Sequence, residues 1–555
     1  GPHDLGPTAA RPRDTGHMPQ GVPAGLGLGL FIAVIGGLLV VRIAALAVNQ
    51  TDLFFDEAQY WTWAKDPAWG YYSKPPVIAW VISLTTGLLG DTPFAIRLAS
   101  PILHTLTAVF IYLAARQIYQ NGAVAALAGI LFALLPGISF SSGIISTDVP
   151  LLTCFAAALW LFARYLAAPS ILGASLLGLA IGAGLLAKYA MAYFFLGVIV
   201  WLVAAPIGQR AVLNIKFLPA IGVAVAMLAP NLWWNVANGG VTFSHTADNA
   251  KWGGPLFHPD KMGEFFAAQS GVFGPVLFAA LLIIAWRALR SGRSPGTTQL
   301  EPLVTSRDAM LLSFALPVIA VVMTQALLSR AHANWAAVAY VSAVMVVAAT
   351  LLRDRAVWAR WATYVLHGAV VLALAAGLAL APRLELPGAP FARVLGWETT
   401  LDKVSQFARS QAAASRPFAA IIADDRAVVA EARYYLRELG LPVLAWQEDA
   451  RIDDHYELTT PFPPAGTVAQ RLQRTRRDSG NAADVDTPTE LNAGAAPAVR
   501  VLVLHHRPEM GALASLPQSE RLQPFVGTAG VGGTRTLYAA TGMVPMSWLS
   551  EGESR

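Results

Sequence analysis

One short stretch of the sequence, TDLFFDEAQYWTWAKDPAWGYYSKPPVIAW (51–80), carries both an acidic pair and a constrained lysine. Asp56 and Glu57 directly follow a long apolar segment, and Lys74 comes eighteen residues after Asp56. A carboxylate can act as a general base on a hydroxyl group when its geometry and pKa fit. Two prolines follow Lys74 and disfavour helix before them, so its ammonium group is held in place. A fixed cation can stabilise an anionic leaving group as its charge develops.

Each of these groups also has a simpler interpretation. The Asp-Glu pair could merely end a helix at a membrane surface, and Lys74 could extend its charged end toward water beside an aromatic belt. The acid, the lysine and the intervening aromatic residues together favour a site. Most of those aromatic residues are expected to anchor the chain at the membrane interface, while one or two could stack on a sugar. The intervening aromatic residues are Trp61, Trp63, Trp69, Tyr71 and Tyr72.

Five further charged residues are candidates for substrate contact. Arg97 lies at the expected start of an apolar span, where it could assist a phosphate or only anchor the helix. Asp148 could face a cavity or cap a helix, and capping is the favoured interpretation. Lys188 interrupts an apolar segment, and because charges inside membranes are costly and usually functional, a phosphate or cavity role is favoured. Arg330 and His332 could contact substrate or be ordinary loop residues.

The composition shows which elements must position these residues. Hydrophobic residues make up 55% of the 555-residue chain and charged residues only 13%, against roughly 25% charged in water-soluble domains. The apolar residues gather in stretches near the ~20 residues that cross a bilayer. We therefore expect a multi-pass all-α membrane protein with about eleven spans. The expected spans are 25–48, 95–115, 122–139, 149–167, 171–187, 190–206, 217–236, 271–289, 309–328, 335–352 and 362–381.

The basic residues indicate the orientation. The net charge of +5 is interpreted as topology rather than nucleic-acid binding, because arginines cluster in short loops on one side, as the positive-inside rule requires. A cytoplasmic start and an odd number of spans then place the loops 49–94 and 237–270 and the C-terminus outside. Within the first loop, the short apolar segment 76–90 suits an interfacial helix. The single cysteine excludes a disulfide framework.

The sequence divides into three parts. Residues 1–22 have no apolar core and look like a tag or disordered N-terminus. Residues 23–384 form the transmembrane domain with its interfacial helices. Residues 385–555 are expected to form a small α/β extracytoplasmic domain with a flexible insertion at 457–498. Its expected elements are strands at 418–423, 442–446 and 499–506 and a helix at 425–439.

Four motifs resemble one family. Asp56-Glu57 after the first span, the Tyr-Tyr-x-Lys-Pro-Pro segment (71–76), FAIRLAS (94–100) and ISTDVPLL (145–152) are similar to the bacterial branch of the GT-C glycosyltransferases. That branch includes the aminoarabinose transferase of lipid A, galacturonic-acid transferases and protein O-mannosyltransferases. The resemblance covers about 30–350 and implies a GT-C type membrane fold.

The resemblance also implies roles for individual residues. Asp56 corresponds to the catalytic base, Lys74 to the lysine that contacts the lipid phosphate, and Tyr60 to a tyrosine of the lipid A enzymes. Glu57, Tyr71 and Tyr72 fall in the same motifs and are expected to contribute to substrate binding. Those enzymes carry a metal-associated acid before the lysine, where this chain has a serine. A divalent metal is possible, but none is predicted.

These expectations combine into one function. A site outside the membrane cannot use cytoplasmic nucleotide sugars, so the donor is expected to be a polyprenyl-phosphate-linked sugar, transferred with inversion to lipid A, lipopolysaccharide or another envelope glycolipid. The expected location is the bacterial inner membrane, with a periplasmic active site and membrane lipids as further partners. A protein Ser or Thr acceptor is an alternative. A transporter for a lipid-linked sugar is another, and translocation without transfer would distinguish it.

Overall fold

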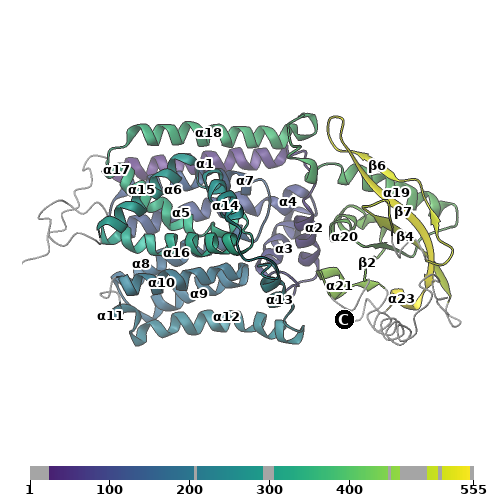
Figure 1. The fold of residues 1–555 in the computed structure, drawn as a ribbon, viewed down its shortest axis with the longest axis horizontal. Helices are drawn as coiled ribbons and strands as arrows, with labels where there is room; N and C mark the ends of the chain where they lie inside the picture. Colours follow the sequence, from purple (N-terminus) through teal and green to yellow (C-terminus); the bar gives the residue numbers. More distant parts are fainter. Residues whose placement is uncertain are drawn as a thin grey trace, which may run out of the picture.

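The computed structural model describes residues 24–204, 209–291, 305–447, 452–462, 497–510 and 516–550. It has two parts, a bundle of helices and an α/β domain at one end of the bundle (Figure 1). The tag-like segment 1–22 lies outside the described residues, as does most of the predicted insertion 457–498.

Long apolar helices dominate the bundle. Within the described ranges, six are long and apolar enough to cross a membrane, or seven if the bent pair α14 and α15 forms one span. The chain is therefore a multi-pass membrane protein. The six are α1 (Ala24–Ala47), α4 with α5 (Pro93–Arg97 and Ala99–Tyr119), α8 (Asp148–Ala167), α12 (Leu218–Ala237), α16 (Ser306–Leu328) and α18 (Val357–Leu380).

Shorter apolar helices fill the rest of the bundle. Each of the eleven predicted segments contains helix, but several helices fall short of the ~20 residues that a bilayer requires, so the count of eleven stays a prediction. The predicted interfacial segment 76–90 is helix α3 (Val77–Leu89). The other short helices and the bent pair are α6 (Gly122–Leu134), α9 (Ile171–Ala187), α10 (Tyr193–Ala204), α17 (Ala339–Arg353), α14 (Pro259–Val272) and α15 (Pro275–Ser291).

Two breaks in the bundle have local causes. Helix α6 ends before Leu135, whose ψ of 136° is extended, because the following Pro136 disfavours helical backbone in the residue before it. Helix α7 (Pro136–Ser141) then starts in a new direction. Helices α14 and α15 meet at Gly274, whose φ of 88° is readily adopted only by glycine, and their axes bend by 116°.

The outer helices turn apolar side chains away from the protein. Trp233 on α12, Trp358 and Val365 on α18 and Val40 on α1 are all more than half exposed. Contiguous apolar surface of this extent is unfavourable in water but favourable against lipid chains. Helix α17 is the opposite case, because nearly all of its residues are buried inside the bundle.

The C-terminal part is built around a mixed sheet of order β3-β2-β1-β4-β7-β5, with β6 paired to β7. Strands β1, β2, β3 and β4 run parallel, and β7 is antiparallel to β4. The three predicted strands and the predicted helix are present. The predicted insertion starts too early, since 457–462 still belongs to α21 and β3. The elements are α19 (Trp397–Ala413), β1 (Ala420–Ala423), α20 (Arg426–Tyr435), β2 (Val443–Trp446), α21 (His455–Thr459), β3 (Pro461–Phe462), β4 (Ala498–His505), β5 (Glu520–Arg521), β6 (Phe525–Thr528), β7 (Thr534–Pro545) and α23 (Ser547–Ser550).

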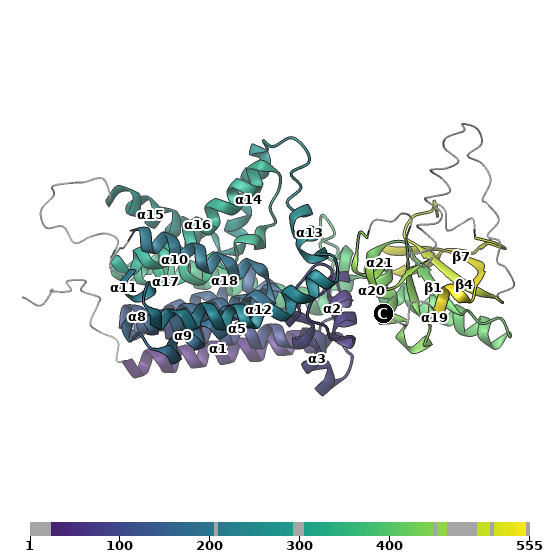
Figure 2. The same cartoon turned by 90° about the horizontal axis from the view of Figure 1, so that it is seen from below.

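A continuous hydrophobic core joins the two parts. Helix α2 (Phe55–Lys65) lies between the bundle and the α/β domain in both views (Figures 1 and 2), and α3 and α4 lie beside it in Figure 1. Trp61 and Trp63 on α2 belong to the same buried cluster as Val428 and Tyr434 on α20. The segment predicted to carry the chemistry is therefore held from both sides.

Candidate active site

Helix α2 carries the Asp-Glu pair in its first turn. The Phe54 N–H donates to a Glu57 carboxylate oxygen at 2.9 Å, which satisfies a backbone donor that the start of a helix leaves without an intrahelical partner. Adjacent residues on a helix point about 100° apart, so the two acids cannot face the same way. Glu57 points into the protein, and Asp56 remains partly accessible.

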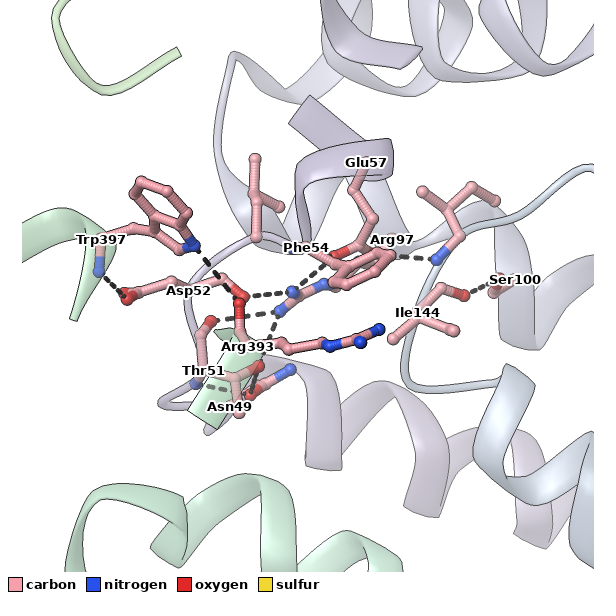
Figure 3. A network of polar contacts seen from close by, with 12 residues as sticks. Asn49, Thr51, Asp52, Phe54, Glu57, Arg97, Ser100, Ile144, Arg393 and Trp397 are labelled. Atoms are coloured by element: carbon pink, nitrogen blue, oxygen red, sulfur yellow. Dashed lines mark hydrogen bonds and ion pairs between the residues drawn. The ribbon is translucent and has the colours of Figure 1, made fainter. Parts of the chain in front are cut away.

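Glu57 forms a buried ion pair with Arg97 (Figure 3). Arg97 donates through Nε and Nη2 to the two Glu57 oxygens at 3.0 and 2.7 Å. Its remaining N–H groups reach Thr51 and the Asp52 carbonyl oxygen at 2.7 to 3.3 Å. The Ile145 N–H donates to Glu57 Oε1 at 3.0 Å. Every donor of the guanidinium group is used within the protein.

The structure corrects the prediction that Glu57 and Arg97 contact substrate. Their side chains are only 1% and 2% exposed and bond to each other. The pair instead holds α2 against α4 and against the segment that leads into α8. The same network reaches the C-terminal part, because Asp52 Oδ2 accepts a hydrogen bond from the Trp397 N–H at 2.7 Å (Figure 3).

The Asp56 carboxylate meets an arginine of the α/β domain. Its side chain is 36% exposed, and Oδ1 lies 3.2 Å from Nη2 of Arg426 at the start of α20. Arg426 Nη1 donates to Gln59 Oε1 at 3.0 Å, and the guanidinium lies 4.7 Å from the centre of the Phe55 ring. No described residue hydrogen-bonds to Asp56 Oδ2. One carboxylate oxygen is thus held while the other is available.

The loop that carries Lys74 is fixed by Tyr71. The Tyr71 hydroxyl accepts from the Ala68 N–H at 3.0 Å and lies 2.9 Å from the Trp63 carbonyl oxygen. Its ring stacks on the Trp63 ring with centres 4.6 Å apart. The Tyr71 N–H donates to the Lys74 carbonyl oxygen at 3.0 Å, which closes the turn. Tyr71 is 2% exposed, so the prediction that it binds substrate was wrong, and its role is to shape the loop.

Lys74 lies at the centre of a cluster of charges. Burial lowers the pKa of Lys74 to about 8, and the neighbouring Lys188 acts in the same direction, while Asp56 and Asp148 raise it. No hydrogen bond or ion pair reaches the ammonium group from any residue within the described ranges. An incompletely solvated cation without a partner is a strong site for an anion.

Asp148 and Lys188 form a second ion pair beside this cluster. Lys188 Nζ lies 2.6 Å from Asp148 Oδ1, and Asn334 Nδ2 donates to Asp148 Oδ2 at 2.6 Å. The favoured capping role of Asp148 was wrong, because both carboxylate oxygens are engaged by side chains rather than by backbone N–H groups. Lys188 follows α9, where the helix stops, and the pair joins α8 and α9 to the segment that precedes α17.

Two predicted tyrosines border the same region. Tyr60 is buried on α2, one helical turn after Asp56, and burial raises its pKa well above the usual value, with Asp56 adding to the effect. Tyr72 donates to the Ile452 carbonyl oxygen of the α/β domain at 3.1 Å, and its ring lies 5.2 Å from that of His245 on α13 (Val241–Asp248). Tyr60 keeps its candidate role, while Tyr72 links the loop to two other elements.

Arg330 and His332 lie on the loop between α16 and α17. Arg330 Nη2 donates to Asn249 Oδ1 at 3.3 Å, and His332 is exposed. Burial lowers the pKa of His332, and the charges of Arg330, Lys188 and Lys74 act in the same direction. Arg330 therefore belongs to the positively charged border of the cluster, while the lowered pKa keeps the His332 imidazole neutral at pH 7. Contact of either residue with substrate stays a prediction.

The position before Lys74 does not favour a metal ion. Ser73 lies where the resemblance implied a metal-associated acid, and it offers a buried neutral hydroxyl in place of the carboxylates that usually hold divalent ions. Within the described ranges, Asp424, His505 and His506 could together hold an ion, in the α/β domain. His505 Nδ1 accepts from the Arg507 N–H at 2.8 Å, so Nε2 carries the proton and donates to Asp424 at 2.5 Å. This tautomer leaves His505 no lone pair for a metal.

Three residues of the site escaped prediction. Arg426 pairs with the Asp56 carboxylate, Gln59 accepts a hydrogen bond from Arg426, and Asn334 completes the contacts of Asp148. Asn334 lies two residues after the candidate His332, so its position in the sequence could have indicated that it belongs to the site. Arg426 gave none, because it is 370 positions from Asp56 and only the tertiary fold brings the two together.

Comparison with known proteins finds glycosyltransferases that are similar to this chain in sequence and in structure. The dolichyl-phosphate-mannose-protein mannosyltransferase family matches residues 73–234. The lipid A galacturonosyltransferase RgtD of Rhizobium johnstonii is 32% identical over 440 residues, which cover 78% of this chain and 88% of the relative. An undecaprenyl phosphate-alpha-4-amino-4-deoxy-L-arabinose arabinosyl transferase of Pseudomonas paraeruginosa is 31% identical over 29% of this chain and 30% of its own length. The crystal structure of ArnT from Cupriavidus metallidurans bound to undecaprenyl phosphate superposes with a TM-score of 0.60, at 14% identity, over 94% of this chain and 98% of that chain, and has the same fold.

Proposed function

We propose that this chain, which belongs to the GT-C family of polyprenyl-phosphate-dependent glycosyltransferases, moves one sugar to lipid A, lipopolysaccharide or another envelope glycolipid. The central support is that Asp56 and Lys74, which both lie between the first two membrane spans, interact electrostatically. Asp56 offers a free carboxylate oxygen, and Lys74 offers a partly buried ammonium group on which the charge of Asp56 acts. The similarity to a lipid A galacturonosyltransferase over most of both chains supports the acceptor class.

The proposed reaction is a direct displacement at the anomeric carbon. Asp56 takes the proton of the acceptor hydroxyl as its oxygen bonds to that carbon. The bond from the anomeric carbon to the phosphate oxygen breaks, and its electron pair leaves with the polyprenyl phosphate. Lys74 stabilises the developing phosphate charge, and Lys188, oriented by Asp148, adds positive potential nearby. A single base and no covalent enzyme intermediate lead to inversion of the anomeric configuration.

The proposed site faces the periplasm of a bacterial inner membrane. Arginines favour the other side of the bundle under the positive-inside rule, and the α/β domain lies at the end of the bundle that carries α2 (Figure 2). A donor anchored in the membrane by its polyprenyl chain can present its head group there, whereas a nucleotide sugar stays in the cytoplasm. The aromatic residues of α2 are mostly buried rather than arranged as a membrane belt: Trp63 is 0% exposed and Trp61 6%.

A second candidate acceptor is a protein hydroxyl group. The match of residues 73–234 to the protein mannosyltransferase family favours it, because that region holds Lys74, Asp148 and Lys188. The donor chemistry and the roles of Asp56 and Lys74 are the same for both acceptors. The relatives are transferases, which speaks against the transporter alternative.

Mass spectrometry of envelope fractions tests the proposed function. Lipid A, glycolipids and proteins are compared between the parent strain, a gene deletion and deletions complemented with the wild type or with Asp56→Asn. We expect a glycolipid to lose the mass of one sugar on deletion and to regain it only with the wild type. Loss from a protein fraction instead would select the second candidate. Unchanged masses in every fraction, or full restoration by Asp56→Asn, would overturn the proposal.

A further inference from the structure

We propose that Arg426 of the α/β domain is a positioning residue for Asp56, so that this domain completes the active site. The inference rests on the proposed function, in which Asp56 is the base. Arg426 Nη2 lies 3.2 Å from Asp56 Oδ1 and reaches the carboxylate from outside the membrane bundle. A base has to point its free oxygen at the acceptor hydroxyl, and a bond to the other oxygen fixes that direction.

Two further residues of α2 hold the guanidinium group in place. Nη1 donates to Gln59 Oε1 at 3.0 Å, and the planar group lies over the Phe55 ring at 4.7 Å. Gln59 is 1% exposed, so its amide is a rigid anchor. An isolated ion pair at a surface contributes little because both side chains must be ordered. Here an aromatic face and a buried amide order the arginine, and its planar shape suits both contacts.

The start of α20 directs Arg426 toward α2. Asp425 caps this helix by accepting from the Ala427 and Val428 N–H groups at 2.8 and 3.3 Å. The cap sets Arg426 as the first helical residue, where the helix faces Asp56. An extra helical turn at the start of α20, or a shift of its cap, would move the Arg426 guanidinium by several ångströms. This is more than its contact with Asp56 tolerates.

Docking of the domain does not depend on Arg426. The Leu53 N–H donates to the Tyr435 hydroxyl at 3.0 Å, the Tyr434 hydroxyl donates to the Asp91 carbonyl oxygen at 3.0 Å, and Arg437 Nη2 donates to the same carbonyl at 3.2 Å. The shared hydrophobic core adds to these bonds. A change at Arg426 should therefore alter the geometry of Asp56 while the two parts remain together.

This separation provides a matched control. Arg437, eleven positions further along the chain, also bonds to the membrane part but lies near Trp61 and Asp91 rather than near Asp56. Arg426→Gln and Arg437→Gln each remove one arginine from the domain interface. Only the first removes a contact of the proposed base.

The test measures sugar transfer by the full-length protein in proteoliposomes, with polyprenyl-phosphate sugar as donor and lipid A as acceptor. For Arg426→Gln we expect kcat to fall about tenfold to a hundredfold, the scale of a misplaced catalytic group, with the donor KM changed less than threefold. Arg426→Lys should recover part of kcat, and Arg437→Gln should keep kcat within threefold of the wild type. Thermal unfolding midpoints of the two glutamine variants that equal the wild-type midpoint show that folding is unaffected.

The outcomes separate this inference from the proposed function. If the wild type transfers sugar, Asp56→Asn does not, and Arg426→Gln equals Arg437→Gln, the positioning role is overturned while the function stands. A rise in kcat for Arg426→Gln would also overturn it, since the ion pair would then restrain the base. If the wild type transfers sugar to no envelope glycolipid, or if Asp56→Asn is fully active, the proposed function itself fails.

Discussion

Replacing Lys74 with methionine should make the protein more stable and inactive at the same time. Burial lowers the pKa of Lys74 from 10.5 to about 8, and one pKa unit corresponds to about 1.4 kcal/mol. The ammonium form therefore costs the folded state about 3 kcal/mol at pH 7, when both folded and unfolded chains carry the proton. Methionine fills similar volume without a charge. Lys74→Met should thus raise the free energy of unfolding by up to about 3 kcal/mol at pH 7.

The gain in the free energy of unfolding from Lys74→Met should depend on pH. Between pH 8 and 10.5 the folded chain releases this proton before the unfolded chain does, so wild-type stability rises with pH in that window. The advantage of Lys74→Met should shrink to about 1 kcal/mol at pH 9.5 and vanish above pH 10.5. The assay is thermal unfolding in detergent, followed by tryptophan fluorescence at several pH values, together with sugar transfer.

This experiment also uses a control variant at an exposed lysine, Lys261, and a ligand, undecaprenyl phosphate. Lys261 is 43% exposed and bonds to Glu264 at 3.0 Å, so Lys261→Met should give no gain in stability and keep transfer. Undecaprenyl phosphate should raise the unfolding midpoint of the wild type but not of Lys74→Met. A Lys74→Met variant that is less stable than the wild type at pH 7, or that still transfers sugar at the wild-type rate, would contradict this prediction.

Two further predictions follow from the same contacts. The kcat/KM for the donor should fall about tenfold per pH unit above pH 8 as the Lys74 ammonium loses its proton, and Lys74→Arg should extend activity to higher pH; a flat profile to pH 10 contradicts this. Glu57→Ala leaves the Arg97 guanidinium buried without its partner and should cost about 3–5 kcal/mol, seen as a lower unfolding midpoint and a lower yield of folded protein. Asp56→Ala, at a partly exposed position one residue away, is the control and should shift the midpoint little.

The sequence predicted the elements of the fold better than their lengths. Every predicted apolar segment contains helix, because hydrophobicity over about 20 residues is a local property. Breaks such as those at Pro136 and Gly274 depend on single residues within these segments and shorten the helices. The predicted strands of the α/β domain are β1, β2 and β4, which are runs of apolar, mostly buried residues. The long antiparallel strand β7 was missed because its residues alternate less clearly.

Residues of one motif were predicted to lie near one another, and their roles in catalysis and binding stay a prediction. Asp56, Tyr60 and Lys74 lie together, as the spacing of the first loop indicated. Glu57 and Arg97 were misassigned because two charges 40 positions apart give no sign in the sequence that they will neutralise each other inside the protein. Burial and pairing decide whether such a charge binds substrate, and both are properties of the tertiary structure.

Single-turnover transfer by purified Asp56→Asn tests whether Asp56 is the general base. The variant keeps the shape of the side chain and removes its ability to accept the proton. We expect transfer from a polyprenyl-phosphate sugar to fall at least a thousandfold, within the range of general-base effects, while the affinity for undecaprenyl phosphate changes less than threefold. Transfer at the wild-type rate, or loss of lipid phosphate binding together with activity, would contradict it.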